Sequence, residues 1–131
     1  MPVYVDSSAF VKLFLDEPES EELQAYIERL ADPPASSVLL RIEATRTVRI
    51  GSASPEAVGA VRAALAGVIL VALGDATISR SETIEPAALR TVDAIHLVTA
   101  LEVGAREMIA YDTRLGDAAR AHGLAVASPG A

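Results

Sequence analysis

The sequence contains no cysteine, which excludes disulfide bonds, thiolate metal sites and thiol nucleophiles. Such a composition fits a reducing compartment, so the cytoplasm is the expected location. Aromatic residues make up only 4% of the chain, and the hydrophobic share of 51% is therefore mostly Ala, Val, Leu and Ile. We expect a core packed from aliphatic side chains, in helices and buried strands.

Long apolar runs and a secretory leader are also missing. No apolar run approaches the roughly 18 residues that span a bilayer, and residues 1–6 lack the basic region and apolar stretch of a signal peptide. We therefore expect no membrane association. The 131 residues contain no evident linker, internal repeat or low-complexity segment, so we expect a single domain over residues 1–131.

Basic residues are scarce: 11 face 18 acidic residues, and the formal net charge is −7. Such a surface repels a polyanion such as RNA on average. This objection weakens if several acids converge on a metal cation, because the ion reverses the local charge and can bridge to a phosphate. Lys12 is the only lysine. The other ten basic residues are arginines. Arginine can bind a phosphate with two parallel hydrogen bonds, although a GC-rich coding bias would also favour arginine over lysine.

Hydrophobic spacing predicts strands that alternate with helices. The predicted strands are residues 2–5, 35–40, 68–73, 108–111 and 124–127, and helical spacing or capping signals follow each of the first four. Alternation of this kind predicts an α/β fold, in which helices cover both faces of a parallel sheet. Ligands of such folds bind beyond the carboxyl ends of the strands, where the strand order reverses.

Local signals refine several of these elements. Residues 68–73 form a continuous apolar run, which predicts a strand buried on both faces of the sheet. We expect Ser36 or Ser37 to cap the helix that follows the second strand. Ser54 before Pro55 predicts the start of a helix over about residues 55–66.

Four acids fall at strand ends or helix starts. Asp6 and Asp112 follow the first and fourth predicted strands, Glu43 lies just inside the helix after the second, and Asp93 opens a later helix. If the first and fourth strands are neighbours, these carboxylates converge, and their mutual repulsion calls for a counter-ion. Oxygen ligands alone favour Mg²⁺ or Mn²⁺. An ion of this kind suits hydrolysis of a phosphodiester bond.

Each acid also has a purely structural interpretation. Asp6 and Asp112 could be helix N-caps, the interpretation we adopt for Asp75. Asp93 could complement the dipole of its helix, and Glu43 could pair with Arg46 three residues on. No single acid decides between the two interpretations.

The histidines and serines are assigned structural roles. His96 follows Asp93 by three residues and could approach the same site, but a lone histidine in an apolar segment is more often a packed residue. His122 is expected to favour the end of a helix. The serines at positions 7, 8, 36 and 37 lie at predicted cap positions without a G-x-S-x-G elbow, which argues against a catalytic triad.

Motifs along the chain resemble those of the PIN-domain endoribonuclease toxins of the VapC type. The similar segments are V-D-S-S-A at residues 5–9, R-I-E-A-T-R at 41–46, L-R-T-V-D-A-I-H-L-V-T-A at 89–100 and Y-D-T-R-L at 111–115. The most specific part is the string D-A-I-H-L-x-T-A, followed at the right distance by Y-D-x-x-L. The resemblance covers essentially the whole chain.

The resemblance implies a three-layer PIN-like fold with a parallel sheet in the order 3-2-1-4-5. It implies an Mg²⁺ or Mn²⁺ site built from Asp6, Glu43, Asp93 and Asp112, with Asp6 and Asp93 as direct ligands. It further implies cleavage of structured RNA such as transfer or ribosomal RNA, a homodimer, and neutralisation by a small VapB-type antitoxin.

Two details of the implied site stay open. Ser7, next to the first acid, either positions the site or only caps a helix. Some relatives carry a further acid shortly after the fourth one, whereas Thr113 and Arg114 follow here and Asp117 is a turn further on. The capacity for a second metal ion is therefore undecided.

Two other functions remain as alternatives. A PIN-like fold could bind RNA or a protein partner without cutting it. A phosphoacceptor domain of the receiver or phosphatase type also places acids at strand ends. Receiver domains, however, need a lysine after a late strand, and the phosphatases need a D-x-D motif that Asp6-Ser7-Ser8 lacks.

Overall fold

The computed structural model describes residues 1–52 and 54–131. Its elements in chain order are β1 (Val3–Val5), α1 (Ser7–Phe10), the 3-10 helix η1 (Val11–Leu13), α2 (Ser20–Glu28), β2 (Ala35–Ser37), α3 (Leu39–Ser52), α4 (Pro55–Leu65), β3 (Ile69–Val71), α5 (Asp75–Thr83), α6 (Thr91–Glu102), β4 (Glu107–Ile109), α7 (Thr113–Ala121) and β5 (Ala125–Ala127). The predicted alternation of strands and helices is confirmed.

The five strands form one parallel sheet in the order β3-β2-β1-β4-β5. The chain runs outward from the central strand β1 through β2 to β3, and then returns to place β4 on the other side of β1. The predicted order 3-2-1-4-5 is confirmed. Its reversal point lies between β1 and β4, and the carboxyl ends of these two strands border the crevice where α/β folds bind ligands.

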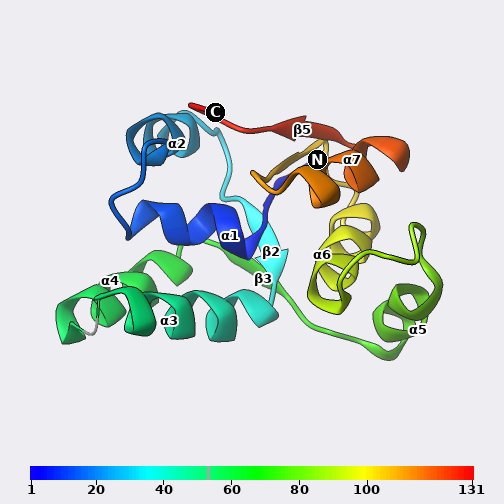
Figure 1. Ribbon diagram of the computed structural model, residues 1–131, viewed down its shortest axis with the longest axis horizontal. Coiled ribbons are helices and arrows are strands. Elements are labelled where there is room, and N and C mark those ends of the chain that lie inside the picture. Colours follow the sequence, from blue (N-terminus) through cyan, green and yellow to red (C-terminus); the bar gives the residue numbers. More distant parts are fainter. Residues whose placement is uncertain (53) are drawn as a thin grey trace.

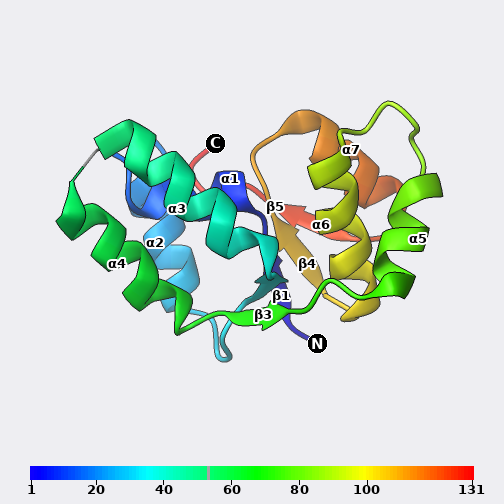
Figure 2. The same ribbon diagram turned by 90° about the horizontal axis from the view of Figure 1, so that it is seen from below.

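Helices cover both faces of the sheet, which gives three layers (Figures 1 and 2). Successive side chains of a strand point to opposite faces, and β1 supplies both cores in this way. Val3 and Val5 pack with buried residues of α1 to α4, whereas Tyr4 packs with buried residues of α6 and α7. Helix α5 lies against α6. Both cores are largely aliphatic, as the composition predicts.

Strand β3 differs from its prediction. The run at residues 68–73 is expected to be buried on both faces, but β3 is an edge strand with β2 as its partner, and Ile69 is 53% exposed. Leu70 packs against the core. The prediction was wrong because central and edge strands can have the same apolar sequence pattern. The topology of the chain decides which position in the sheet the strand takes.

One predicted helix cap holds in part, and another is corrected. Ser36 and Ser37 belong to strand β2, where the Ser36 hydroxyl donates to the carbonyl of Val5. The Ser37 hydroxyl nevertheless accepts from the backbone N–H of Leu39, the first residue of α3, at 3.2 Å. Helix α5 has Gly74 at its N-cap, so Asp75 is its first residue rather than its cap. A polar residue near a helix start thus signals the region of the start, but not its exact position.

The predicted start of α4 after Ser54 is confirmed. The Ser54 hydroxyl accepts a hydrogen bond from the backbone N–H of Ala57 at the start of α4. Gly104 and Gly123 follow α6 and α7 with φ angles of 66° and 90°, the left-handed conformation that ends many helices. Over the residues described, no helix combines the length and apolar character needed to cross a bilayer.

Candidate active site

All four predicted acids line one pocket at the carboxyl ends of β1 and β4. The pocket has a volume of about 480 Å³. Its lining consists of Asp6, Ser7, Ser8, Val11, Glu43, Thr47, Arg90, Thr91, Val92, Asp93 and Asp112. These residues come from α1, η1, α3, the start of α6 and the loop after β4, so the pocket exists only once the sheet has assembled.

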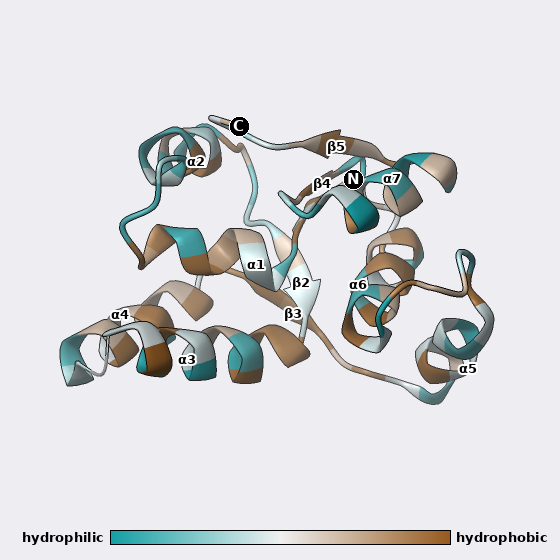
Figure 3. Ribbon diagram, viewed as in Figure 1, coloured by the Kyte–Doolittle hydropathy of each residue, from teal (hydrophilic) through white to brown (hydrophobic). Residues whose placement is uncertain are grey.

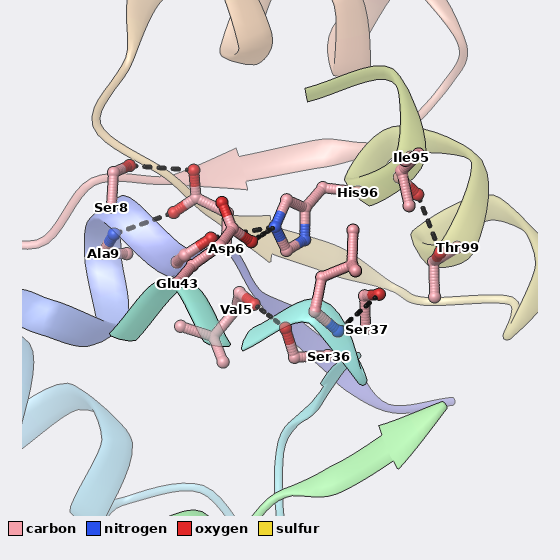
Figure 4. Close-up of polar contacts among 12 residues, drawn as sticks. Val5, Asp6, Ser8, Ala9, Ser36, Ser37, Glu43, Ile95, His96 and Thr99 are labelled. Atoms are coloured by element: carbon pink, nitrogen blue, oxygen red, sulfur yellow. Dashed lines mark hydrogen bonds and ion pairs between the residues drawn. The ribbon is translucent and has the colours of Figure 1, made fainter. Parts of the chain in front are cut away.

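Asp6 is the most deeply buried of the acids, with 3% of its surface exposed. It follows β1 and caps α1: Oδ1 accepts from the Ala9 backbone N–H at 2.8 Å, and Oδ2 accepts from the Ser8 hydroxyl at 2.9 Å (Figure 4). Burial raises the pKa of Asp6 to about 6, although these two hydrogen bonds and the charge of His96 oppose the rise. The capping and functional interpretations therefore apply to the same side chain.

Glu43 reaches the pocket from the first turns of α3 and is held by His96 of α6. The Nε2 atom of His96 lies 2.8 Å from Glu43 Oε1 (Figure 4). It also lies 2.9 Å from the Ser7 hydroxyl. Burial raises the pKa of Glu43, but the hydrogen bond and charge of His96, aided by Ser7, outweigh it and lower this pKa overall. The alternative partner Arg46 makes no ion pair with Glu43 among the residues described.

His96 is itself fixed by Tyr4 on the central strand. The Tyr4 hydroxyl lies 2.6 Å from His96 Nδ1 and accepts from the Ser37 backbone N–H at 3.0 Å. Because an ionised carboxylate only accepts hydrogen bonds, Nε2 of His96 donates to Glu43, while Nδ1 faces the Tyr4 hydroxyl. A chain of hydrogen bonds thus runs from β2 to the pocket.

The sequence predicts part of this network. His96 is 1% exposed, so the expectation of a packed residue is confirmed, but its contact with Glu43 gives it a second role at the site. Tyr4 was missed altogether. It lies in the middle of an apolar strand, and its partner in the sequence is 92 residues away, so no local signal identifies it.

Asp93 and Asp112 share one arginine. Arg90 places Nε 3.2 Å from Asp93 Oδ2 and Nη2 3.5 Å from Asp112 Oδ2, with 71% of its side chain exposed. Asp112 also caps α7, since Oδ1 accepts from the Leu115 backbone N–H at 3.0 Å. It follows β4 after two intervening residues rather than directly.

Asp117 and His122 lie away from these four acids. Asp117 is exposed on α7, pairs with Arg120 and is absent from the pocket lining. His122 is the C-cap of α7, as expected, and its Nε2 atom lies 2.7 Å from the carbonyl of Glu85. Neither residue adds to the predicted site.

The donors fit a hard divalent cation by their chemistry. They are carboxylate oxygens, and a cation would offset both the burial of Asp6 and the mutual repulsion of the acids. Within the described part of the chain, however, no three acidic or histidine side chains lie close enough together to hold a metal ion without moving. Arg90 supplies the positive charge between Asp93 and Asp112, and His96 supplies a donor to Glu43.

Sequence comparisons identify the family of the chain. Residues 3–121 match the family model of the PIN domain. The chain is 40% identical to ribonuclease VapC46 of Mycobacterium tuberculosis over 129 residues, covering 97% of each protein. It is 39% identical to ribonuclease VapC47 of the same species over 136 residues, covering 98% of each.

Solved structures share the fold at lower identity. VapC20 of M. tuberculosis, described as a sarcin–ricin loop cleaving toxin, superposes with a TM-score of 0.79 at 14% identity and covers 97% of this chain and 99% of its own. A toxin–antitoxin complex from Klebsiella pneumoniae gives 0.74 at 21% identity, with 98% of each chain covered. From its full-length matches, this chain belongs to the VapC-type ribonuclease toxins of the PIN-domain family.

Proposed function

We propose that this protein is a metal-dependent endoribonuclease that hydrolyses phosphodiester bonds of structured RNA, either transfer or ribosomal RNA. The observation that carries the proposal is the convergence of Asp6, Glu43, Asp93 and Asp112 on one pocket. The ribonuclease names of the relatives support the reaction class. Such substrates lie in the cytoplasm, where we propose that the protein acts.

In this proposal the four acids are the metal site, with Asp6 and Asp93 as direct ligands and Mg²⁺ or Mn²⁺ as the ion. When bound, such an ion activates a water molecule and stabilises charge on phosphate oxygens. The hydrogen bonds from Ala9 and Ser8 fix the orientation of the Asp6 carboxylate. His96 keeps Glu43 ionised through Oε1, which leaves Oε2 to accept a proton at the pocket.

Replacement of one acid tests the proposal. Asp93→Asn removes a charge but keeps the size of the side chain, and we expect it to lower Mn²⁺-dependent cleavage of transfer RNA at least about 100-fold. The assay uses purified protein freed of any partner. Asp117→Asn is the matched control, because that acid lies outside the pocket. Undiminished cutting by Asp93→Asn would exclude the assigned site.

The same assay separates the enzyme from a module that only binds RNA or a protein. That alternative draws support from the lack of a ready-grouped metal set among the described residues. It predicts that the wild-type protein cuts neither transfer nor ribosomal RNA at any Mn²⁺ concentration, while still retaining RNA in a filter-binding experiment.

We also propose two protein partners: a VapB-type antitoxin and a second copy of this chain in a homodimer. The likeness to a toxin–antitoxin complex supports the first. The acidic pocket already accepts the guanidinium of Arg90, so it suits an arginine from an antitoxin tail. Copurification from the native operon should yield a small companion with a basic tail. Sedimentation of the isolated chain should give twice its 13.7 kDa mass.

A further inference from the structure

Four arginine side chains gather on α3 and α4 outside the acidic pocket. Arg41, Arg46 and Arg62 line a groove of about 1010 Å³ between the two helices. Arg62 also lines an adjoining hollow of about 590 Å³ together with Arg49. All four side chains are exposed. We call the surface that carries Arg41, Arg46, Arg49 and Arg62 the arginine groove.

The charge of the arginine groove is not used within the fold. In the described part of the chain, none of its four guanidinium groups forms an ion pair, and no acidic side chain lines either hollow. Arg90 and Arg120, by contrast, each bind a carboxylate. A positive surface in a protein of net charge −7 is therefore open to an anion from outside.

Helix α3 is a wall shared by the arginine groove and the acidic pocket. Glu43 and Thr47 line the pocket, whereas Arg41 and Thr45 line the groove. With about 100° of rotation per residue, Arg46 lies between these two faces of the helix. Figure 3 shows the same mixed character, since hydrophilic and hydrophobic segments alternate along α3. The two sites are thus adjacent across one helix.

Apolar side chains complete the groove. Ile42 is 59% exposed and lines it together with Leu39 and Leu65. Guanidinium groups beside apolar side chains suit a ligand that carries phosphates on one side and sugar or base faces on the other. A ligand with phosphates alone would gain nothing from Ile42.

We propose that the arginine groove binds the phosphate backbone of the RNA substrate, so that the RNA runs from the acidic pocket past Arg46 into the groove. The inference rests on the proposed function. Guanidinium groups form paired hydrogen bonds with phosphate oxygens. The net charge of −7 repels RNA on average, and the four arginines provide a local surface that attracts its phosphates. In this proposal the acidic pocket cleaves the RNA, and the arginine groove binds it.

The test measures binding of bulk transfer RNA in the presence of a chelator, so that no cleavage intervenes. The Arg41→Gln/Arg62→Gln double variant removes one charge from each wall of the groove. We expect its affinity to fall about tenfold near 150 mM salt, and the slope of log affinity against log salt to become shallower by between about one and two.

A matched control removes two arginines elsewhere. Arg29 and Arg106 are exposed, and they lie at the end of α2 and just before β4, outside both the pocket and the groove. The Arg29→Gln/Arg106→Gln variant should change affinity by less than about twofold. The charge-conserving Arg41→Lys/Arg62→Lys variant should retain the wild-type salt slope, and thermal melts should show all three variants folded.

The outcomes separate the groove from the proposed function. Equal loss in both Gln doubles, or no loss in the groove double, overturns the groove as an RNA surface. A shift in sedimentation of the groove double with unchanged RNA affinity overturns it in favour of a protein interface. If the wild-type chain binds RNA through the groove but never cuts it with Mn²⁺, the nuclease proposal fails while the groove stands.

Discussion

The two halves of the acidic pocket are built differently. The inner half, Asp6 and Glu43, is held by hydrogen bonds from Ala9, Ser8 and His96. In the outer half, Asp93 and Asp112 face each other across an exposed arginine, and only Asp112 has a further anchor as a helix cap. The inner half is thus fixed by the fold before any ion arrives, whereas the outer half can rearrange.

This difference indicates how the pocket tolerates four negative charges. Burial raises the pKa of Asp6, so a proton can reduce the charge of the inner half. Arg90 neutralises the outer half. A divalent cation would take the place of both the proton on Asp6 and the guanidinium of Arg90. The two halves can be tested separately.

The largest effect is expected from the inner half, at His96. His96→Ala removes a buried ring and leaves Tyr4 and Glu43 without their partner, which should lower the free energy of unfolding by about 3–5 kcal/mol. Urea denaturation measures it. His122→Ala is the control, because that histidine is exposed and should cost less than about 1 kcal/mol. Equal losses of unfolding free energy in the two variants would show that the hydrogen bonds of His96 do not stabilise the inner half.

A smaller effect is expected from the charge of Asp6 in the metal-free chain. Its folded-state pKa of about 6 lies above the ordinary value of 3.8, so the folded chain holds this proton more tightly than the unfolded chain does. The associated stability is full below about pH 4 and is lost as pH rises through about 6. The loss is at most about 3 kcal/mol.

Asp6→Asn should abolish this pH dependence, because Asn keeps the capping oxygen but carries no charge. In chelator above pH 6 the variant should therefore unfold at a higher temperature than the wild-type chain, and Asp117→Asn should not. Parallel pH profiles for wild type and Asp6→Asn would contradict the raised pKa. Mn²⁺ should then stabilise the wild type but not the Asp6 variant.

The smallest effect is expected in the outer half, at Arg90. Because Arg90 competes with a cation for Asp93 and Asp112, Arg90→Gln should bind Mn²⁺ more tightly. An exposed ion pair is worth at most about 1 kcal/mol, which limits the gain to about fivefold. Electron paramagnetic resonance of free Mn²⁺ measures it. Arg120→Gln breaks the equivalent exposed pair with Asp117 and should leave the affinity unchanged; weaker binding by the Arg90 variant would contradict the competition.

Much of the fold and the placement of the acids could be predicted from the sequence. Asp6 and Asp112 follow strands that turn out to be neighbours, and parallel strands place their carboxyl ends at one edge of a sheet. Topology therefore brings distant acids together without any knowledge of side-chain packing. The choice between cap and functional residue was not exclusive, since both acids cap a helix and line the pocket.

The rest depends on packing that no local pattern encodes. The contact of Arg90 with Asp93 has the familiar spacing of three residues, but its contact with Asp112 spans 22. The contact between Tyr4 and His96 joins the central strand β1 to helix α6 across 92 residues of sequence. The edge position of β3 likewise depends on the order of the strands rather than on its own residues.

One measurement tests the central claim most directly: anomalous diffraction from crystals of the wild-type protein grown with Mn²⁺. We predict a manganese peak within the pocket, bound by Asp6 and Asp93, with Arg90 displaced from the outer half. A pocket without manganese at saturating concentration, or a peak only at Asp117 or another surface acid, would contradict the claim that these four carboxylates form a metal centre.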